Sequence, residues 1–149
     1  MKKKYIITIV VILSSFIFLI EFSNSYQIKD YNYDVEIHRD TWGVPHIYGQ
    51  SDKDAAFGLA YAHCEDDYET IEEVILALRG EFASVKGYKY APIDYLVGLL
   101  KVWDNVNSKY DEEISDEVKL ICDAYADGVN RYIEKNNIKS NIYPAKGKD

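Results

Sequence analysis

Residues 33–49 read YDVEIHRDTWGVPHIYG, and this stretch decides how the chain begins to fold. Val35 and Ile37 alternate with polar residues, which is the period of a strand with one buried face. Gly43 can take a positive φ and Pro45 fixes the next φ, so a reversal is predicted over residues 41–44 and a return strand over residues 46–49. A hairpin this short is not stable alone, so we expect it to join a larger sheet or to lie on helices.

The residues after the hairpin predict a long amphipathic helix. Ser51 followed by Asp54 is a variant of the capping box, which predicts the start of the helix. Several alanines and Gly58 keep one side thin, and a helical glycine costs roughly 1 kcal/mol unless close packing compensates for it. Apolar residues then recur every three or four positions as far as Gly80, which predicts the end. The helix either continues through Asp66 or bends there.

The second half of the chain predicts two more helices. Residues 88–91 are interpreted as a linker, and Pro92 suits the first turn of a helix whose apolar side extends to Trp103 and which ends near Asn105 and Asn107. After the last predicted helix, which is described below, residues 138–149 show no periodicity.

The last helix has the clearest pattern. Ser115 is its predicted cap, and Asn136 and Asn137 are its predicted end. One apolar stripe is formed by Val118, Ile121, Cys122, Tyr125, Val129, Tyr132 and Ile133. One hairpin and three or four amphipathic helices predict an α+β fold, and their unmatched apolar faces indicate that residues 26–149 are an incomplete domain.

The amino terminus has the pattern of an export signal. Three lysines at positions 2–4 precede the apolar residues 5–20, and the small residues at 23–25 predict cleavage before Tyr26. An uncleaved membrane anchor is the alternative, although the apolar run is just short of the ~17 to 25 residues that span a bilayer. Either interpretation places the remainder outside the cytoplasm.

The composition excludes one class of partner. The formal net charge is −8, and removing residues 1–25, which hold three lysines and one glutamate, changes it to −10. Nucleic-acid binding requires basic clusters that displace counterions, and none occurs outside the leader. We therefore expect no nucleic-acid partner, and membrane contact only through an uncleaved leader.

Two cysteines leave two possibilities. Cys64 and Cys122 fall on different predicted helices and could form a disulfide in an exported protein. Two separate thiols packed as small apolar residues are the alternative, which we favour because nothing in the sequence brings the two Cα atoms within ~7 Å.

Two groups of side chains could carry chemistry. Asp40 and His46 offer an acid and a base, but without a nucleophile at a diagnostic spacing a structural role in the turn is the stronger interpretation. His63 and Asp67 are four residues apart on a helix and could chelate a metal. An acidic run on a helix is more often a solvated face, and one short helix cannot supply all the ligands of calcium.

Three segments, taken in order, resemble the penicillin acylase family of N-terminal-nucleophile hydrolases. They read VEIHRDTWGVPHIY at residues 35–48, GLAYAHCEDDYETIEEVILALRGEFASVKG at residues 58–87 and DAYADGVNRYI at residues 123–133. Many penicillin acylases place arginine where this chain has Asp67, so the pattern is closer to that of the acyl-homoserine-lactone and aculeacin acylases. The residues that match family motifs, which we expect to be structural, are Asp40, Gly43, Pro45, His46, Asp66, Gly80, Gly128 and Asn130.

The resemblance implies part of an αββα fold and a precursor that cuts itself into an α and a β chain. This chain matches the α region, so the nucleophile is expected beyond Asp149, and Ser115 and Ser140 are not candidates. The implied partners are the β chain and an acylated small molecule such as a penicillin or an acyl homoserine lactone. No cofactor is expected within this chain, and calcium is expected, if anywhere, in the complete enzyme. A truncated non-catalytic product, or an exported binding or structural module, is the alternative.

Overall fold

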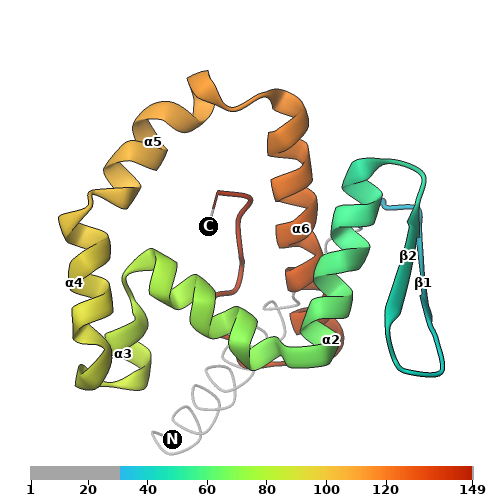
Figure 1. Ribbon diagram of the computed structural model, residues 1–149, viewed down its shortest axis with the longest axis horizontal. Coiled ribbons are helices and arrows are strands. Elements are labelled where there is room, and N and C mark those ends of the chain that lie inside the picture. Colours follow the sequence, from blue (N-terminus) through green and yellow to red (C-terminus); the bar gives the residue numbers. More distant parts are fainter. Residues whose placement is uncertain (1–30, 149) are drawn as a thin grey trace, which may run out of the picture. The chain divides into compact units, whose positions relative to one another are not determined.

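A computed structural model describes residues 31–148 of the chain. The predicted leader, cleaved or anchored, lies outside these residues. The described elements, shown in Figure 1, are β1 (Val35–Arg39), β2 (Pro45–Gly49), α2 (Asp52–Arg79), α3 (Phe82–Lys86), η1 (Tyr88–Tyr90), α4 (Ala91–Leu99), α5 (Val102–Glu113) and α6 (Asp116–Lys135). None of the helices within residues 31–148 combines the length and the apolar content that crossing a membrane requires.

The predicted hairpin is confirmed. β1 and β2 are antiparallel, with Ile37 opposite Ile47. The reversal uses Gly43 at φ +84°, and the Gly43 amide donates to the Asp40 carbonyl at 3.0 Å. Gly58 of α2 lies directly against this sheet, because a Cβ built there would be 2.6 Å from Val35 Cγ2. The small residue therefore permits the close contact that the sequence predicted.

α2 bends where the sequence offered a bend. Asp67 has non-helical dihedral angles of φ −159° and ψ 76°, which divide the helix into two halves. Figure 1 shows the first half beside the hairpin and the second half leading toward α3. Gly80 ends α2 at φ +69°, as predicted. Ser51 is the N-cap and α2 begins at Asp52, as predicted, although the Ser51 hydroxyl accepts no helix amide and instead donates to Asp54 Oδ2 at 2.6 Å.

The main helix contact joins α2 to α6. Gly128 lies so close to the backbone of Phe57 that a Cβ there would be 2.7 Å from the Ala60 side chain and nearer still to the Phe57 carbonyl. Val129 and Ile133 of the predicted apolar stripe are buried, whereas Val118 is exposed, so the stripe is covered only along the later turns of α6. The core cluster consists of Ala60, Cys64, Leu76, Phe82, Ala126, Val129, Ile133, Ile142 and Ala145.

The region between α2 and α6 differs from its prediction. The expected linker at residues 88–91 contains the short 3₁₀ helix η1, and the expected helix through Trp103 breaks at Lys101, whose φ is +51°. Trp103 thus belongs to α5, which continues past Asn105 and Asn107. The described residues consequently form five α-helices rather than three or four. The break at Lys101 was not predicted because the apolar pattern continues across it.

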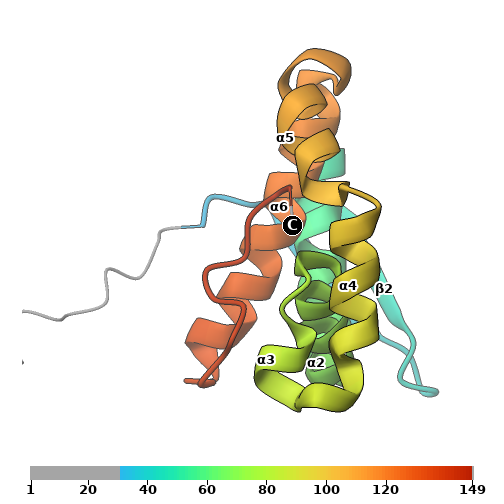
Figure 2. The same ribbon diagram turned by 90° about the vertical axis from the view of Figure 1, so that its left-hand side faces the viewer.

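The C-terminal segment, residues 138–148, has no helix or strand and lies along α6 (Figure 2). Ser115 caps α6 as predicted, its hydroxyl accepting the Val118 amide at 3.4 Å, and α6 ends at Lys135 with Asn136 as its C-cap. Ile142 and Ala145 of the C-terminal segment are buried in the core. A stretch without periodicity therefore contributes to the packing.

Candidate functional site

Arg39, in the first family motif, connects the hairpin to α2. The Arg39 guanidinium donates to the Gly43 carbonyl at 2.8 Å, and its Nη1 lies 2.8 Å from Asp66 Oδ1. Its Nη2 lies 3.2 Å from Glu65 Oε2 and 3.3 Å from the Ala62 carbonyl. The hydrogen bond to Glu65 and the charge of Asp66 raise the pKa of Arg39, so the guanidinium stays charged. Asp66 is thereby engaged in holding β1 against the helix.

Asp40 and His46 lie at the turn of the hairpin. Asp40 Oδ1 accepts the amides of Trp42 at 2.8 Å and Val44 at 3.0 Å, and His46 Nε2 lies 3.4 Å from Asp40 Oδ2. Partial burial alone would raise the pKa of Asp40, but the two amides and His46 outweigh it and lower that pKa. A carboxylate held in this way closes the turn, which favours the structural interpretation of the pair.

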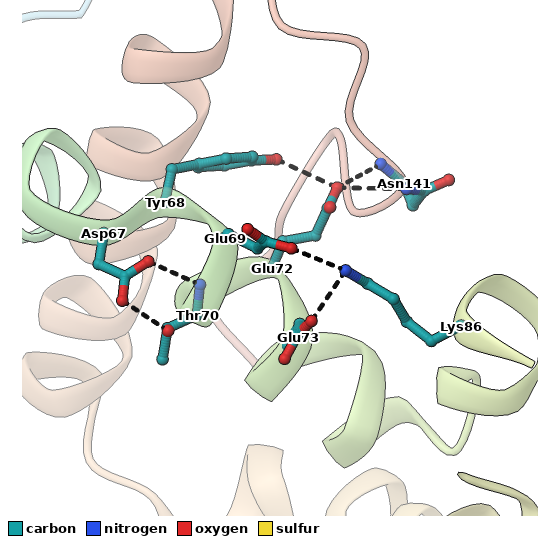
Figure 3. A network of polar contacts seen from close by, with 8 residues as sticks. All are labelled: Asp67, Tyr68, Glu69, Thr70, Glu72, Glu73, Lys86 and Asn141. Atoms are coloured by element: carbon teal, nitrogen blue, oxygen red, sulfur yellow. Dashed lines mark hydrogen bonds and ion pairs between the residues drawn. The ribbon is translucent and has the colours of Figure 1, made fainter. Parts of the chain in front are cut away.

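The bend of α2 is stabilised by its own side chain. Asp67 Oδ1 accepts the Thr70 amide at 3.1 Å and Oδ2 accepts the Thr70 hydroxyl at 2.6 Å, which makes Asp67 the cap of the second half of the helix (Figure 3). The Thr70 hydroxyl and amide lower the pKa of Asp67. His63 Nδ1 instead lies 3.0 Å from the Tyr125 hydroxyl. His63 and Asp67 are therefore each held by another partner, Tyr125 and Thr70 respectively.

Glu72 anchors the C-terminal segment to the same half of α2. Its Oε1 accepts the Asn141 amide at 2.7 Å and the Tyr68 hydroxyl at 3.3 Å (Figure 3). The Tyr68 hydroxyl also lies 2.7 Å from Ser140 Oγ. Ser140, which was not expected to be the nucleophile, is thus part of a structural network.

A lysine bridge supports the helix after the bend. Lys86 Nζ lies 3.1 Å from Glu69 and 2.8 Å from Glu73, which ties α3 to α2. The hydrogen bonds to Glu73 and Glu69 raise the pKa of Lys86. Figure 3 shows the lysine reaching from α3 between the two carboxylates. The single positive charge of Lys86 offsets part of the negative charge of Glu69 and Glu73.

The third family motif fixes the C-terminal segment to α6. Asn130 is buried, and its side-chain amide donates to the Ala145 carbonyl at 3.0 Å while its oxygen accepts the Ala145 amide at 2.8 Å. Both backbone groups of Ala145 are thereby satisfied inside the protein. Gly128, in the same motif, permits the close approach of α2.

Neither a metal centre nor a disulfide is found among the described residues. Within residues 31–148 no group of three or more His, Cys, Asp or Glu side chains is placed to hold a metal ion. Cys64 and Cys122 are free, which agrees with the interpretation as separate thiols. Burial raises the pKa of the Cys64 thiol to about 12, so it remains protonated and unreactive at neutral pH.

Sequence reasoning missed Arg39, Glu72 and Asp94. Asp94 accepts the Phe82 amide at 3.0 Å and the Ala83 amide at 2.8 Å, capping α3 from a distance of eleven residues or more. Asp94 is the only charged residue among residues 91–100, and a lone charge on an apolar helix is a signal of an inward-facing acceptor. No comparable signal marks Arg39, because its partners lie far along the chain.

Comparisons with known proteins agree with these motifs. The sequence model of the penicillin amidase family matches residues 34–146. The penicillin acylase 2 proenzyme of Pseudomonas sp. is 31% identical over 74% of this chain and 14% of its own length. The acyl-homoserine lactone acylase QuiP of Pseudomonas putida is 30% identical over 66% of this chain and 12% of its own length. The chain thus spans about an eighth of the length of these relatives.

A solved structure extends the likeness to the fold. A thermostable penicillin G acylase from Alcaligenes faecalis superposes with a TM-score of 0.59 and 25% identity, covering 72% of this chain and 56% of that chain. The predicted fold class, a hairpin and helices from an N-terminal-nucleophile hydrolase, is confirmed by this neighbour. Since the family model covers most of the sequence and its motifs build the contacts described above, this chain belongs to the penicillin amidase family.

Proposed function

We propose that this chain is the α-chain region of an exported amidohydrolase that cleaves the amide bond of an acylated small molecule. The observation that carries the proposal is the family match over residues 34–146. The names of the relatives, penicillin acylase and acyl-homoserine lactone acylase, point to a β-lactam or an N-acyl homoserine lactone as the substrate class.

The nucleophile is proposed to lie on a β chain beyond Asp149. Self-cleavage of the precursor would expose a serine, or less often a cysteine or threonine, whose free α-amine has a reference pKa of roughly 7.7 to 8.0 and can accept the hydroxyl proton. The oxygen would attack the substrate carbonyl carbon and form an ester while the amine leaves with the proton. Water would then hydrolyse the ester, releasing the acid and regenerating the serine.

The residues described here support that division of labour. Asp40 accepts amides within the turn of the hairpin, Asp66 pairs with Arg39, and Asp67 accepts the Thr70 amide at the bend of α2. The contacts of Asp40 and Asp66 shape the hairpin and join it to α2, and those of Asp67 fix the bend of α2, which is the contribution we assign to this region. The region would pack against the β chain and help to form the acyl pocket.

Export and calcium remain proposals for the complete protein. The leader pattern at residues 1–25 supports export as a cleaved or anchored protein. Within residues 31–148 no three His, Cys, Asp or Glu side chains are grouped to hold a metal ion, so we propose that any calcium site takes at least part of its ligands from the rest of the complete protein. No step of the proposed reaction depends on that ion.

The test begins with the coding sequence that follows Asp149. An in-frame stretch with a Gly-Ser-Asn-like junction supports the proposal, and a precursor expressed from it should appear as two chains of which the second begins with serine. Changing that serine to alanine should leave one uncut chain without acyl release. A frame-shifted continuation, or none, would instead favour the non-catalytic alternative.

A further inference from the structure

The polar side of α6 is covered by two segments of the chain. Four polar residues recur along the helix at spacings of four, three and four positions, which at about 100° per residue places them opposite the apolar stripe. They are Asp123, Asp127, Asn130 and Glu134. Three of them accept hydrogen bonds from residues that lie outside any helix. This side of α6 therefore binds other parts of the chain, where a solvated face would be the usual arrangement.

The N-terminal segment, residues 31–34, is bound to this side through its tyrosines. The Tyr31 hydroxyl donates to Glu134 Oε1 at 3.0 Å, and the Tyr33 hydroxyl donates to Asp127 Oδ2 at 2.8 Å. The segment is thus antiparallel to α6, and the Tyr33 ring stacks on Phe57 of α2 with ring centroids 4.4 Å apart. Burial raises the pKa of both phenols, so each remains a hydrogen-bond donor at neutral pH.

The C-terminal segment is bound to the same side of α6 (Figure 2). The Ala145 amide donates to Asn130 Oδ1 at 2.8 Å. Gly147 packs on Asp123, since a Cβ built at this glycine would be 2.7 Å from the Asp123 amide nitrogen. Residue numbers rise along this segment while they fall along the helix. The C-terminal segment is therefore also antiparallel to α6 and has the same direction as the N-terminal segment.

One carboxylate receives both segments. The Tyr143 hydroxyl donates to Glu134 Oε1 at 2.9 Å, and the same oxygen accepts the Tyr31 hydroxyl. The other oxygen, Glu134 Oε2, is buried and has no hydrogen-bond partner among residues 31–148. A hydrogen bond in such surroundings is stronger than one exposed to water, because water does not compete for the acceptor. Opening either segment would admit water to the carboxylate and weaken the bond that the other segment keeps.

We propose that Glu134 couples the N-terminal and C-terminal segments, so that loosening one of them loosens the other. Two stretches far apart in the sequence then hold each other in place through one shared acceptor. The effect must be reciprocal, because a coupling free energy between two sites acts equally in both directions. A change in the N-terminal segment, which follows the predicted leader, is thereby transmitted to the C-terminal segment.

Hydrogen exchange of the full-length protein, followed by mass spectrometry, tests the coupling. Tyr31→Phe removes only the hydroxyl that donates to Glu134. Tyr33→Phe is the matched control, because it removes the same group from the same segment but at Asp127. We expect Tyr31→Phe to accelerate exchange of the amides in residues 142–147 at least about fivefold, and Tyr33→Phe to accelerate it less than about twofold.

Tyr143→Phe tests the opposite direction and serves as the second variant should Tyr31→Phe fail to fold. It should accelerate exchange of the amides in residues 32–34 by a comparable factor, because the coupling is reciprocal. The amides around Leu76, which is buried in the core, are the internal reference and should keep their rates in all three variants.

Three outcomes would overturn the proposal. The first is acceleration confined to the segment that carries the substitution, which would mean that the two segments open independently. The second is an equal effect of Tyr31→Phe and Tyr33→Phe on residues 142–147, because the loosening would then not depend on Glu134. The third is acceleration that extends equally to the amides around Leu76, which would assign the effect to a general loss of stability.

Discussion

The hairpin with α2 and α6 differs sharply from α4 and α5 in how it uses its apolar residues. In the first region Gly58 and Gly128 let backbones approach closely, and Leu76, Val129 and Ile133 are buried. In the second region neither helix has a buried residue. The first region buries a core in its own contacts, although Trp42, Tyr48 and Leu120 are exposed, whereas the second region leaves its large apolar side chains partly or largely exposed on the described residues.

The largest expected effect comes from a glycine exchange in each region. Gly128→Ala should destabilise the fold by about 3 kcal/mol, because the new Cβ would collide with the Phe57 backbone. Gly98→Ala in α4 should stabilise it by up to about 1 kcal/mol, because no atom lies within 4 Å of the new Cβ and alanine favours a helix. Urea unfolding of residues 26–149, followed by circular dichroism, measures both. Equal changes in stability for Gly128→Ala and Gly98→Ala would contradict the difference in packing between the two regions.

Asn130→Ala should have the next largest destabilising effect and lower the free energy of unfolding by about 2 kcal/mol. The substitution leaves the amide and carbonyl of Ala145 buried without partners. Asn136→Ala, at an exposed asparagine that donates to the Tyr132 carbonyl, is the control and should change stability by less than about 0.5 kcal/mol. Thermal unfolding compares the two. A loss no larger than that of the control would show that the C-terminal segment is not held by Asn130.

The same two regions differ in how much of their structure can be predicted from the sequence. The hairpin, the bend near Asp66 and the end at Gly80 depend on local backbone chemistry, which residue types reveal. The break at Lys101 has no such signal, because neither glycine nor proline marks it and apolar periodicity runs across it. The partners of Arg39 and Glu72 were also missed, since they are set by contacts between distant residues.

Asp67→Asn should have a pH-dependent effect. The pKa of Asp67 is lowered in the folded state by Thr70, so its stabilisation is fully present above the unfolded value of about 3.9 and is lost as the pH falls through the folded pKa. The variant should therefore be less stable than the parent at pH 7, and the difference should shrink below about pH 4. Urea midpoints between pH 3 and pH 7 follow this. A difference independent of pH would contradict a charged cap at the bend.

The smallest effect is expected at the joint of the second region. Trp103→Phe removes the bond from the indole to the Leu78 carbonyl and should cost about 0.5 kcal/mol, because that contact is exposed. The same urea series measures it. A loss as large as that of Asn130→Ala would mean that α5 is part of the core after all.

The most direct measurement is acyl release by purified residues 26–149 and, in parallel, by the complete precursor. Penicillin G and an N-acyl homoserine lactone serve as substrates, and the freed amine is quantified. We expect release by the processed precursor and none by residues 26–149, because we propose that the nucleophile lies beyond Asp149. Release by residues 26–149 alone would contradict it.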